Sequence, residues 1–139
     1  MKPTKQMIEN EPAGPRIDAW FCELVMGWKL WTRQSEFGDE YLCWHERGEK
    51  DYIKPGKYIC VEDSFRPSTN IAHAIEGVEI ANNNGLWGWI ERPIFLNWHV
   101  TFAKGKGEID DVIDYHAEAK ELSLAITKAL LLWAIEKDK

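Results

Sequence analysis

Two tryptophans that flank a glycine, Trp87 and Trp89, begin the set of residues that could do chemistry. Alternate residues of a strand share one face, so both indoles would lie on the same side of a strand. Two aromatic rings beside a residue without a side chain can form a slot for a flat ligand or a hydrophobic hot spot. Arg92, Lys104 and Lys106 follow and could hold an anionic, nucleotide-like molecule there. Packing of the indoles within the protein is the alternative interpretation.

A second candidate group is an acidic cluster that contains Asp110, Asp111 and Asp114. Neighbouring carboxylates can bind a divalent cation or share a proton. Their order does not match the loop of an EF-hand, in which acidic residues alternate with others around an obligatory glycine. We therefore interpret the segment as a solvated acidic loop or, where it acts, as a contact surface for a basic partner.

The chain has three cysteines and four histidines, without a CxxC or HxxxH spacing. Cys43 and His45 would share one face of a strand, and Cys60 lies in the next expected strand, so the three could converge if these strands pair. Convergence would permit a metal site or a Cys–His nucleophile, and core cysteines with edge histidines are the alternative. Since no motif fixes such a site, the sequence predicts no metal, no cofactor and no enzymatic activity.

The net charge of the chain limits the type of binding partner, and the number of cysteines indicates the cellular compartment. The 139 residues carry a formal net charge of −6, which disfavours general nucleic-acid binding and suits a partner with a basic surface. An odd number of cysteines without paired spacing indicates free thiols in a reducing compartment. No stretch approaches the ~18 apolar residues of a membrane span. The polar segment Met1–Asn10 lacks the apolar core of a signal peptide, so we expect a cytoplasmic protein without membrane contact.

The stretch Phe65–Ala81 predicts the helix around which the other elements are arranged. Pro67 marks a sharp entry, and Ser68 and Thr69 are good N-cap residues. Apolar residues then recur at the spacing of one helix face, and a run of three asparagines and a glycine ends the helix. The apolar face comprises Ile71, Ala74, Ile75 and Val78.

Periodicity and turn residues place the other elements on both sides of this helix. A first helix is predicted over Pro15–Gly27, and a last helix over Glu118–Lys137 is apolar on most sides, which requires burial by the chain or by a second subunit. Residues 1–14 are expected to form a flexible arm and 15–139 a single domain. The predicted fold is α+β, with three amphipathic helices and a mainly antiparallel sheet of about five strands. The expected strands are Trp28–Arg33, Tyr41–Glu46, Tyr58–Asp63, Leu86–Arg92 and Ile94–Ala103, with a short edge strand at Tyr115–Ala117.

Three motifs together resemble a known family. Met26–Lys29 (MGWK) closes the first helix, Phe65–Ala74 (FRPSTNIAHA) opens the second, and an alanine-rich helix closes the chain. In this combination the chain resembles the small phage and prophage proteins of the phage ABA sandwich domain family over most of 17–136. The resemblance implies a three-layer α-β-α sandwich and a phage or prophage setting, and it implies no catalytic residues. The long segments 47–57 and 105–114 depart from the family's pattern.

Three functions follow from these observations. The first is a non-enzymatic phage or prophage accessory protein that binds and modulates a host protein, as a counter-defence inhibitor would. The second is a small-ligand binder that sequesters an anionic, nucleotide-like molecule through the tryptophans, the arginine and the lysines. The third is a metal- or thiol-dependent enzyme. The breadth of the last helix's apolar surface also predicts a homodimer.

Overall fold

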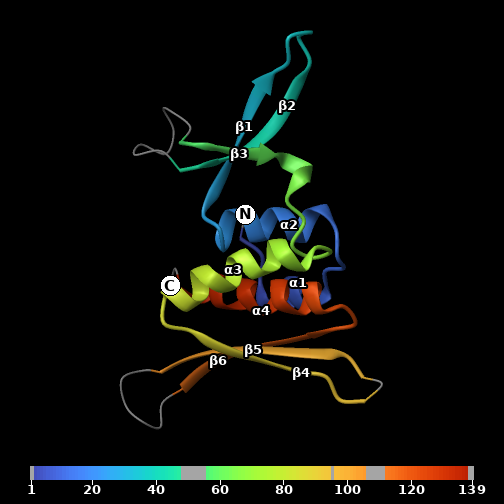
Figure 1. The fold of residues 1–139 in the computed structure, drawn as a ribbon, viewed down its shortest axis with the longest axis vertical. Helices are drawn as coiled ribbons and strands as arrows, with labels where there is room; N and C mark the ends of the chain where they lie inside the picture. The colour runs from blue at the N-terminus through green and yellow to red at the C-terminus, as the bar shows by residue number, and fades with distance from the viewer. Residues whose placement is uncertain (1, 48–55, 95, 106–111, 138–139) are drawn as a thin grey trace.

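The computed structural model describes residues 2–47, 56–94, 96–105 and 112–137. Figure 1 shows the helices in the middle of the molecule and a three-stranded antiparallel sheet on each side of them. The helices are α1 (Lys5–Asn10), α2 (Pro15–Leu24), the 3-10 helix η1 (Glu62–Ser64), α3 (Ile71–Asn83) and α4 (Leu122–Lys137). The strands are β1 (Trp28–Gln34), β2 (Glu40–Glu46), β3 (Tyr58–Val61), β4 (Trp87–Glu91), β5 (Trp98–Gly105) and β6 (Val112–Ala119).

The α+β class and the antiparallel pairing confirm the prediction, but the division into sheets does not follow it. The described strands form two sheets, β1-β2-β3 and β4-β5-β6, instead of one sheet of about five strands. The helices occupy the middle layer, where the expected sandwich had its sheet (Figure 1). The reason lies in the connection between β3 and β4, because η1 and α3 carry the chain across the helical layer before the second sheet begins.

Helix α4 is the centre of the fold. Helices α1, α2 and α3 pack against it, and so do strands β5 and β6. Its side chains are buried from Ala125 through Ala134, which accounts for a helix that is apolar on most sides. The chain itself therefore covers the surface that suggested a second subunit. The helix begins at Leu122, later than predicted, because β6 extends to Ala119.

The segment expected to be a flexible arm contains helix α1, and this expectation needs correction. Thr4 caps the helix by accepting from the backbone N–H of Met7, at 3.2 Å, and Ile8 is fully buried in the core. Lys128 of α4 donates from its Nζ to the carbonyl oxygen of Glu9, at 2.8 Å, near the last turn of α1. Burial lowers the pKa of Lys128. A six-residue helix depends on such tertiary contacts, which a local pattern does not reveal.

Ser68 does not cap α3 as predicted but joins three parts of the fold. Its backbone N–H donates to Oδ1 of Asp18 on α2, at 2.8 Å, and its carbonyl accepts from the hydroxyl of Ser123 on α4, at 3.0 Å. Its own hydroxyl accepts from the N–H of Gly14, at 3.1 Å. Asn70 caps α3 instead, because its Oδ1 accepts from the first free N–H groups of the helix.

Glycines at the C-terminus and in the middle of α3 illustrate how the sequence specifies the packing of this helix. At its C-terminus Gly85 adopts a φ of +87°, and the N–H of Leu86 donates to the carbonyl of Ala81, as in a Schellman motif. Within the helix, Gly77 allows a close approach to α2 and α4. A Cβ on Gly77 would meet the ring of Phe21 and would lie 3.0 Å from Cδ1 of Leu130.

None of the helices in the described part of the chain is long and apolar enough to cross a membrane.

Candidate functional site

The face of the β4-β5-β6 sheet that points away from the helices brings the predicted tryptophans together with titratable side chains. Directly opposite residues of antiparallel strands share a face, so the register defines three rows across this sheet. Val100 and Phe102 of β5 belong to the hydrophobic core beneath the sheet, and their alternating neighbours lie on the other side. We call that other side the outer face. Its rows are Trp87–Ala103–Asp114, Trp89–Thr101–His116 and Glu91–His99–Glu118.

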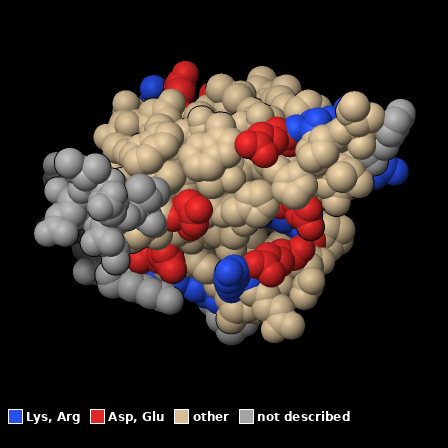
Figure 2. Space-filling view, turned by 90° about the horizontal axis from the view of Figure 1, so that it is seen from below, with Lys and Arg blue, Asp and Glu red and all other residues tan. Residues whose placement is uncertain are grey.

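In the first two rows of the outer face, the larger side chains stand on the two edge strands and small ones lie on the central strand. Trp87 and Trp89 are 48% and 43% exposed, whereas Thr101 and Ala103 are buried between their neighbours. Figure 2 looks onto this side of the molecule and shows acidic side chains spread among uncharged ones, with some Lys and Arg side chains beside them. Half-exposed indoles within a polar surround are typical of protein-contact surfaces.

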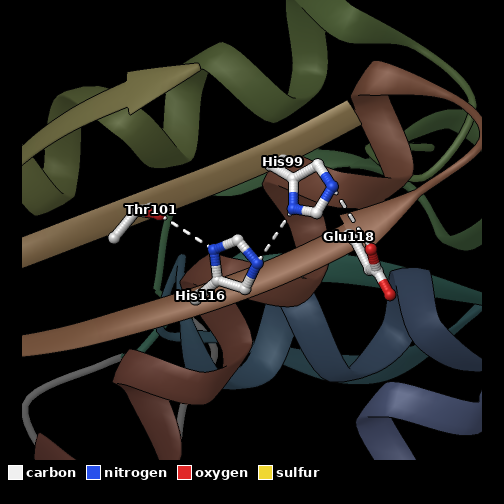
Figure 3. Close-up of polar contacts among 4 residues, drawn as sticks. All are labelled: His99, Thr101, His116 and Glu118. Carbon is white, nitrogen blue, oxygen red and sulfur yellow. Dashed lines mark hydrogen bonds and ion pairs between the residues drawn. The ribbon is translucent and has the colours of Figure 1, made fainter. Parts of the chain in front are cut away.

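A continuous chain of polar contacts crosses the outer face from β5 to β6 (Figure 3). The hydroxyl of Thr101 lies 2.9 Å from Nδ1 of His116, and Nε2 of His116 lies 3.2 Å from Nδ1 of His99. Nε2 of His99 then lies 3.3 Å from a carboxylate oxygen of Glu118. Each imidazole nitrogen of the pair thus has one partner. The two histidines can exchange protons along this chain, and Glu118 supplies the negative end.

The structure separates the tryptophans from the cations that were predicted to accompany them. The guanidinium of Arg92 lies over the ring of Trp98, 5.0 Å from its centroid, and Trp98 packs against the core below the sheet. Lys104 follows Phe102 at an interval of two, so strand alternation places it on the helix side of β5. Of the predicted charged residues that the structure describes, only Asp114 joins Trp87 and Trp89 on the outer face. Lys106, Asp110 and Asp111 lie outside the described residues.

Gly88 does not form the predicted slot with the two indoles, because it faces the other side of the sheet. Gly88 pairs with Phe102 and therefore lies on the helix side of β4, opposite in orientation to its two tryptophan neighbours. A Cβ on Gly88 would lie 2.8 Å from two ring carbons of Phe102. The glycine therefore makes room for a core phenylalanine, and the indoles form an open surface.

The cysteines do not converge with a histidine. Register on the β2–β3 ladder shifts between Trp44 and His45, so Cys60 lies opposite Trp44, whereas Tyr58 lies opposite His45. Cys60 therefore pairs with Trp44, and neither Cys43 nor His45 is its partner across the ladder. Burial raises the pKa of the thiols of Cys22 and Cys60, which disfavours the nucleophilic thiolate. Among the described residues, no three His, Cys, Asp or Glu side chains are arranged to hold a metal ion.

Thr101 does not have the surroundings of a catalytic nucleophile either. Its hydroxyl contacts a histidine, as in a hydrolase, but it lies on the central strand of its sheet. Strand β5 pairs with β4 and β6 on both sides of Thr101, so its neighbouring backbone N–H groups are engaged in the ladders. A hydrolase needs free N–H groups to stabilise an oxyanion. The outer face is therefore suited to binding and proton exchange.

The described structure also contains several cavities, and two of them include polar groups named above or in the fold. One, of about 640 Å³, lies between α2, η1 and the turn before α3, and contacts within the chain already engage several of its polar groups. Asp18 bonds to Ser68 there, and Arg66 donates from Nε to the carbonyl of Asp63. The other, of about 690 Å³, lies beside the free edge of β6 and includes His116 in its wall.

Comparison with known proteins gives no relative from which to assign the site: a scan of family models, a search of curated proteins and a search of solved structures find no match. The assignment of the site therefore depends on its geometry. The sequence patterns select Trp87, Trp89 and Asp114 but not the pair formed by His99 and His116. Alternation within a strand shows only that His99 and Thr101 share a face, and only the register of β6 could bring His116 next to His99.

Proposed function

We propose that this protein is a non-enzymatic binding module and that the outer face of the β4-β5-β6 sheet contacts a partner protein with a basic surface. The observation that carries the proposal is the presence of two half-exposed tryptophans and three carboxylates on one side of a single sheet. The carboxylates belong to Glu91, Asp114 and Glu118.

Aromatic and acidic groups favour such a partner for separate reasons. Burial of an exposed indole by a partner removes a large apolar surface from water, and tryptophan is enriched among residues that dominate binding energy. The three carboxylates attract lysine and arginine side chains, which can also stack on the indoles. An anionic small molecule is supported less well, since Arg92 and Lys104 lie away from the tryptophans and the carboxylates would repel it.

The resemblance to the phage ABA sandwich domain family suggests the biological setting of the proposal. The partner would be a protein of the bacterial host, bound in the host's cytoplasm. A protein of this size can inhibit by covering a functional surface of its partner, as a counter-defence inhibitor does.

The proposal can be tested by capture of partners from the cytosol of a bacterial host, followed by affinity measurements with the purified partner. The informative variant is Trp87→Ala/Trp89→Ala. Its matched control is Phe37→Ala, since Phe37 is 89% exposed at the tip of the β1–β2 hairpin, far from the outer face (Figure 1). Far-ultraviolet circular dichroism establishes that each variant is folded.

The tryptophan variant should bind the partner at least ~30-fold more weakly, because a hot-spot residue contributes about 2 kcal/mol or more. The control should bind like the wild type, and added salt should weaken the wild-type complex through screening of the carboxylates. A partner that binds the tryptophan variant and the wild type equally would refute the assignment of the outer face.

A further inference from the structure

We propose that His99 and His116 form a proton switch that takes up one proton as a unit and thereby sets the charge of the outer face. The proton switch follows from the hydrogen-bonded chain alone (Figure 3). Its consequence for binding rests on the proposed function. The proton switch and its effect on binding can be tested separately.

With both histidines neutral, the chain has one direction that satisfies every contact. A carboxylate only accepts, so His99 must donate to Glu118 from Nε2 and leave Nδ1 without a proton. His116 must then donate from Nε2 to Nδ1 of His99, which leaves its own Nδ1 to accept from the hydroxyl of Thr101. Glu118 therefore selects the Nε2–H tautomer of both rings.

One added proton fits the chain, and a second does not. With one proton added, His116 donates from Nδ1 to the oxygen of Thr101, the two rings share the proton between them, and His99 still donates to Glu118. The threonine changes from donor to acceptor. A second proton would place N–H groups on both of the facing nitrogens, 3.2 Å apart, and that contact would break. While the chain of contacts is intact, the pair therefore holds at most one added proton.

The charged groups around the pair determine what the first proton does to binding. Glu91 faces His99 from β4, Glu118 faces it from β6, and Asp114 lies two residues before His116 on β6. The cavity beside His116 also includes basic and acidic groups of the N-terminal segment and α4, namely Lys2, Lys5, Glu9 and Glu136. On the outer face itself, the first proton cancels one of three negative charges. Proton uptake and a basic partner therefore compete, and acidification should weaken binding.

The first experiment measures the tautomers of all four histidines by long-range ¹H–¹⁵N correlation of the full chain. The other two histidines serve as internal controls. His45 must carry its proton on Nδ1, which lies 3.0 Å from the carbonyl oxygen of Gly56. His73 must carry it on Nε2, because its Nδ1 accepts from the N–H of Arg66.

At pH 8 we expect the Nε2–H tautomer for both His99 and His116, and acidification towards pH 5 should give one shared step before a second. Glu118→Ala removes the acceptor, so His99 should then also populate the Nδ1–H tautomer. Thr101→Val should leave both tautomers unchanged, because Glu118 remains. Separate protonation steps for the two rings, or a tautomer of His99 that is the same in Glu118→Ala, would overturn the switch.

The second experiment measures binding of a decalysine peptide by calorimetry at pH 7.5 and pH 5.5. The wild type should bind about fivefold more weakly at the lower pH, as expected for one unit of charge at close range in water. His99→Gln/His116→Gln should lose this dependence. An equal pH dependence in both proteins would overturn the link between the pair and binding. Absence of decalysine binding at either pH, together with the expected tautomers, would contradict the proposed basic partner and leave the proton switch supported.

Discussion

Removal of the Asp18 carboxylate is the most informative test of how the helices are held together. The side chain is buried on α2, and its Oδ1 accepts from the backbone N–H of Ser68, at 2.8 Å. Asp18→Ala leaves that buried N–H without its acceptor. Asp18→Asn retains an oxygen at the same place and removes only the charge.

The expected magnitudes follow from the type of bond that is lost. A hydrogen bond to a charged group contributes about 1.5–3 kcal/mol, and relief of the buried charge offsets part of this loss. We therefore expect Asp18→Ala to lower the free energy of unfolding by about 2 kcal/mol and Asp18→Asn by less than ~1 kcal/mol. With a typical urea slope, the alanine variant should unfold at a urea concentration about 1 M lower.

The pH dependence of the asparagine variant tests the environment of the carboxylate. Burial raises the pKa of Asp18 above its ordinary value, although the Ser68 bonds and the charge of Arg66 oppose this shift. The folded protein therefore binds the proton more tightly than the unfolded chain. The wild type loses stability as pH rises from about 4 through the folded pKa, and the cost is fully present above that value. Relative to the wild type, Asp18→Asn should thus be least destabilising at neutral pH and most destabilising near pH 4.

Urea titrations of both proteins between pH 4 and pH 7 measure this difference directly. Ser123→Ala is the matched control, because it removes a neutral hydrogen bond to the carbonyl of Ser68 and should cost about 1 kcal/mol at every pH. If Asp18→Asn instead becomes less destabilising as the pH falls, the Ser68 and Arg66 interactions outweigh burial and our account of Asp18 is wrong.

Two further predictions concern the packing around α3 and the edge of the second sheet. Gly77→Val should lower the free energy of unfolding by about 2–3 kcal/mol, because the new side chain would overlap the ring of Phe21. If the variant unfolds at the same urea concentration as the wild type, α2 and α3 can move apart without a loss of stability and the prediction is wrong. Burial and the hydrogen bond to Glu136 raise the pKa of Tyr115 to about 12. In an absorbance titration of the folded protein, Tyr115→Phe should therefore delete the ionisation nearest pH 12, and loss of an earlier step would contradict the assignment.

The helices and strands of this fold are predictable where their signals are local. The period of the apolar residues identified α2, α3 and α4, and alternation between turn residues identified the first five strands. Helix α1 gave no such signal, because a single buried residue, Ile8, and a contact from Lys128 hold it on α4. Its formation depends on a helix that lies more than 110 residues later in the chain.

The candidate site was predictable only in the parts that depend on alternation within one strand. Trp87 and Trp89 share a face for that reason, and the structure places them so. Whether Arg92 and Lys104 lie near the tryptophans depends on the side of the sheet to which each residue projects. Both lie on the helix side, with Trp98 and Phe102. The adjacency of His99 and His116 depends on the register between β5 and β6, which a local pattern does not specify. The pairing of Cys60 with Trp44 in place of Cys43 is a register effect of the same kind.

The two faces of the β4-β5-β6 sheet differ in their contacts with the helices, which explains why the outer face is available for binding. Val100 and Phe102 anchor the sheet to α4 from one side, and Ala117 and Ala119 do the same from β6. The residues between them in the same strands, which lie on the outer face, are then not required to fill the core. A sheet selected only for stability would carry small polar or charged side chains on this side. Two tryptophans leave nearly half of their surface in water, which favours association. The outer face therefore carries the residues whose types the fold itself does not demand, which is the expected position of a functional surface on a rigid scaffold.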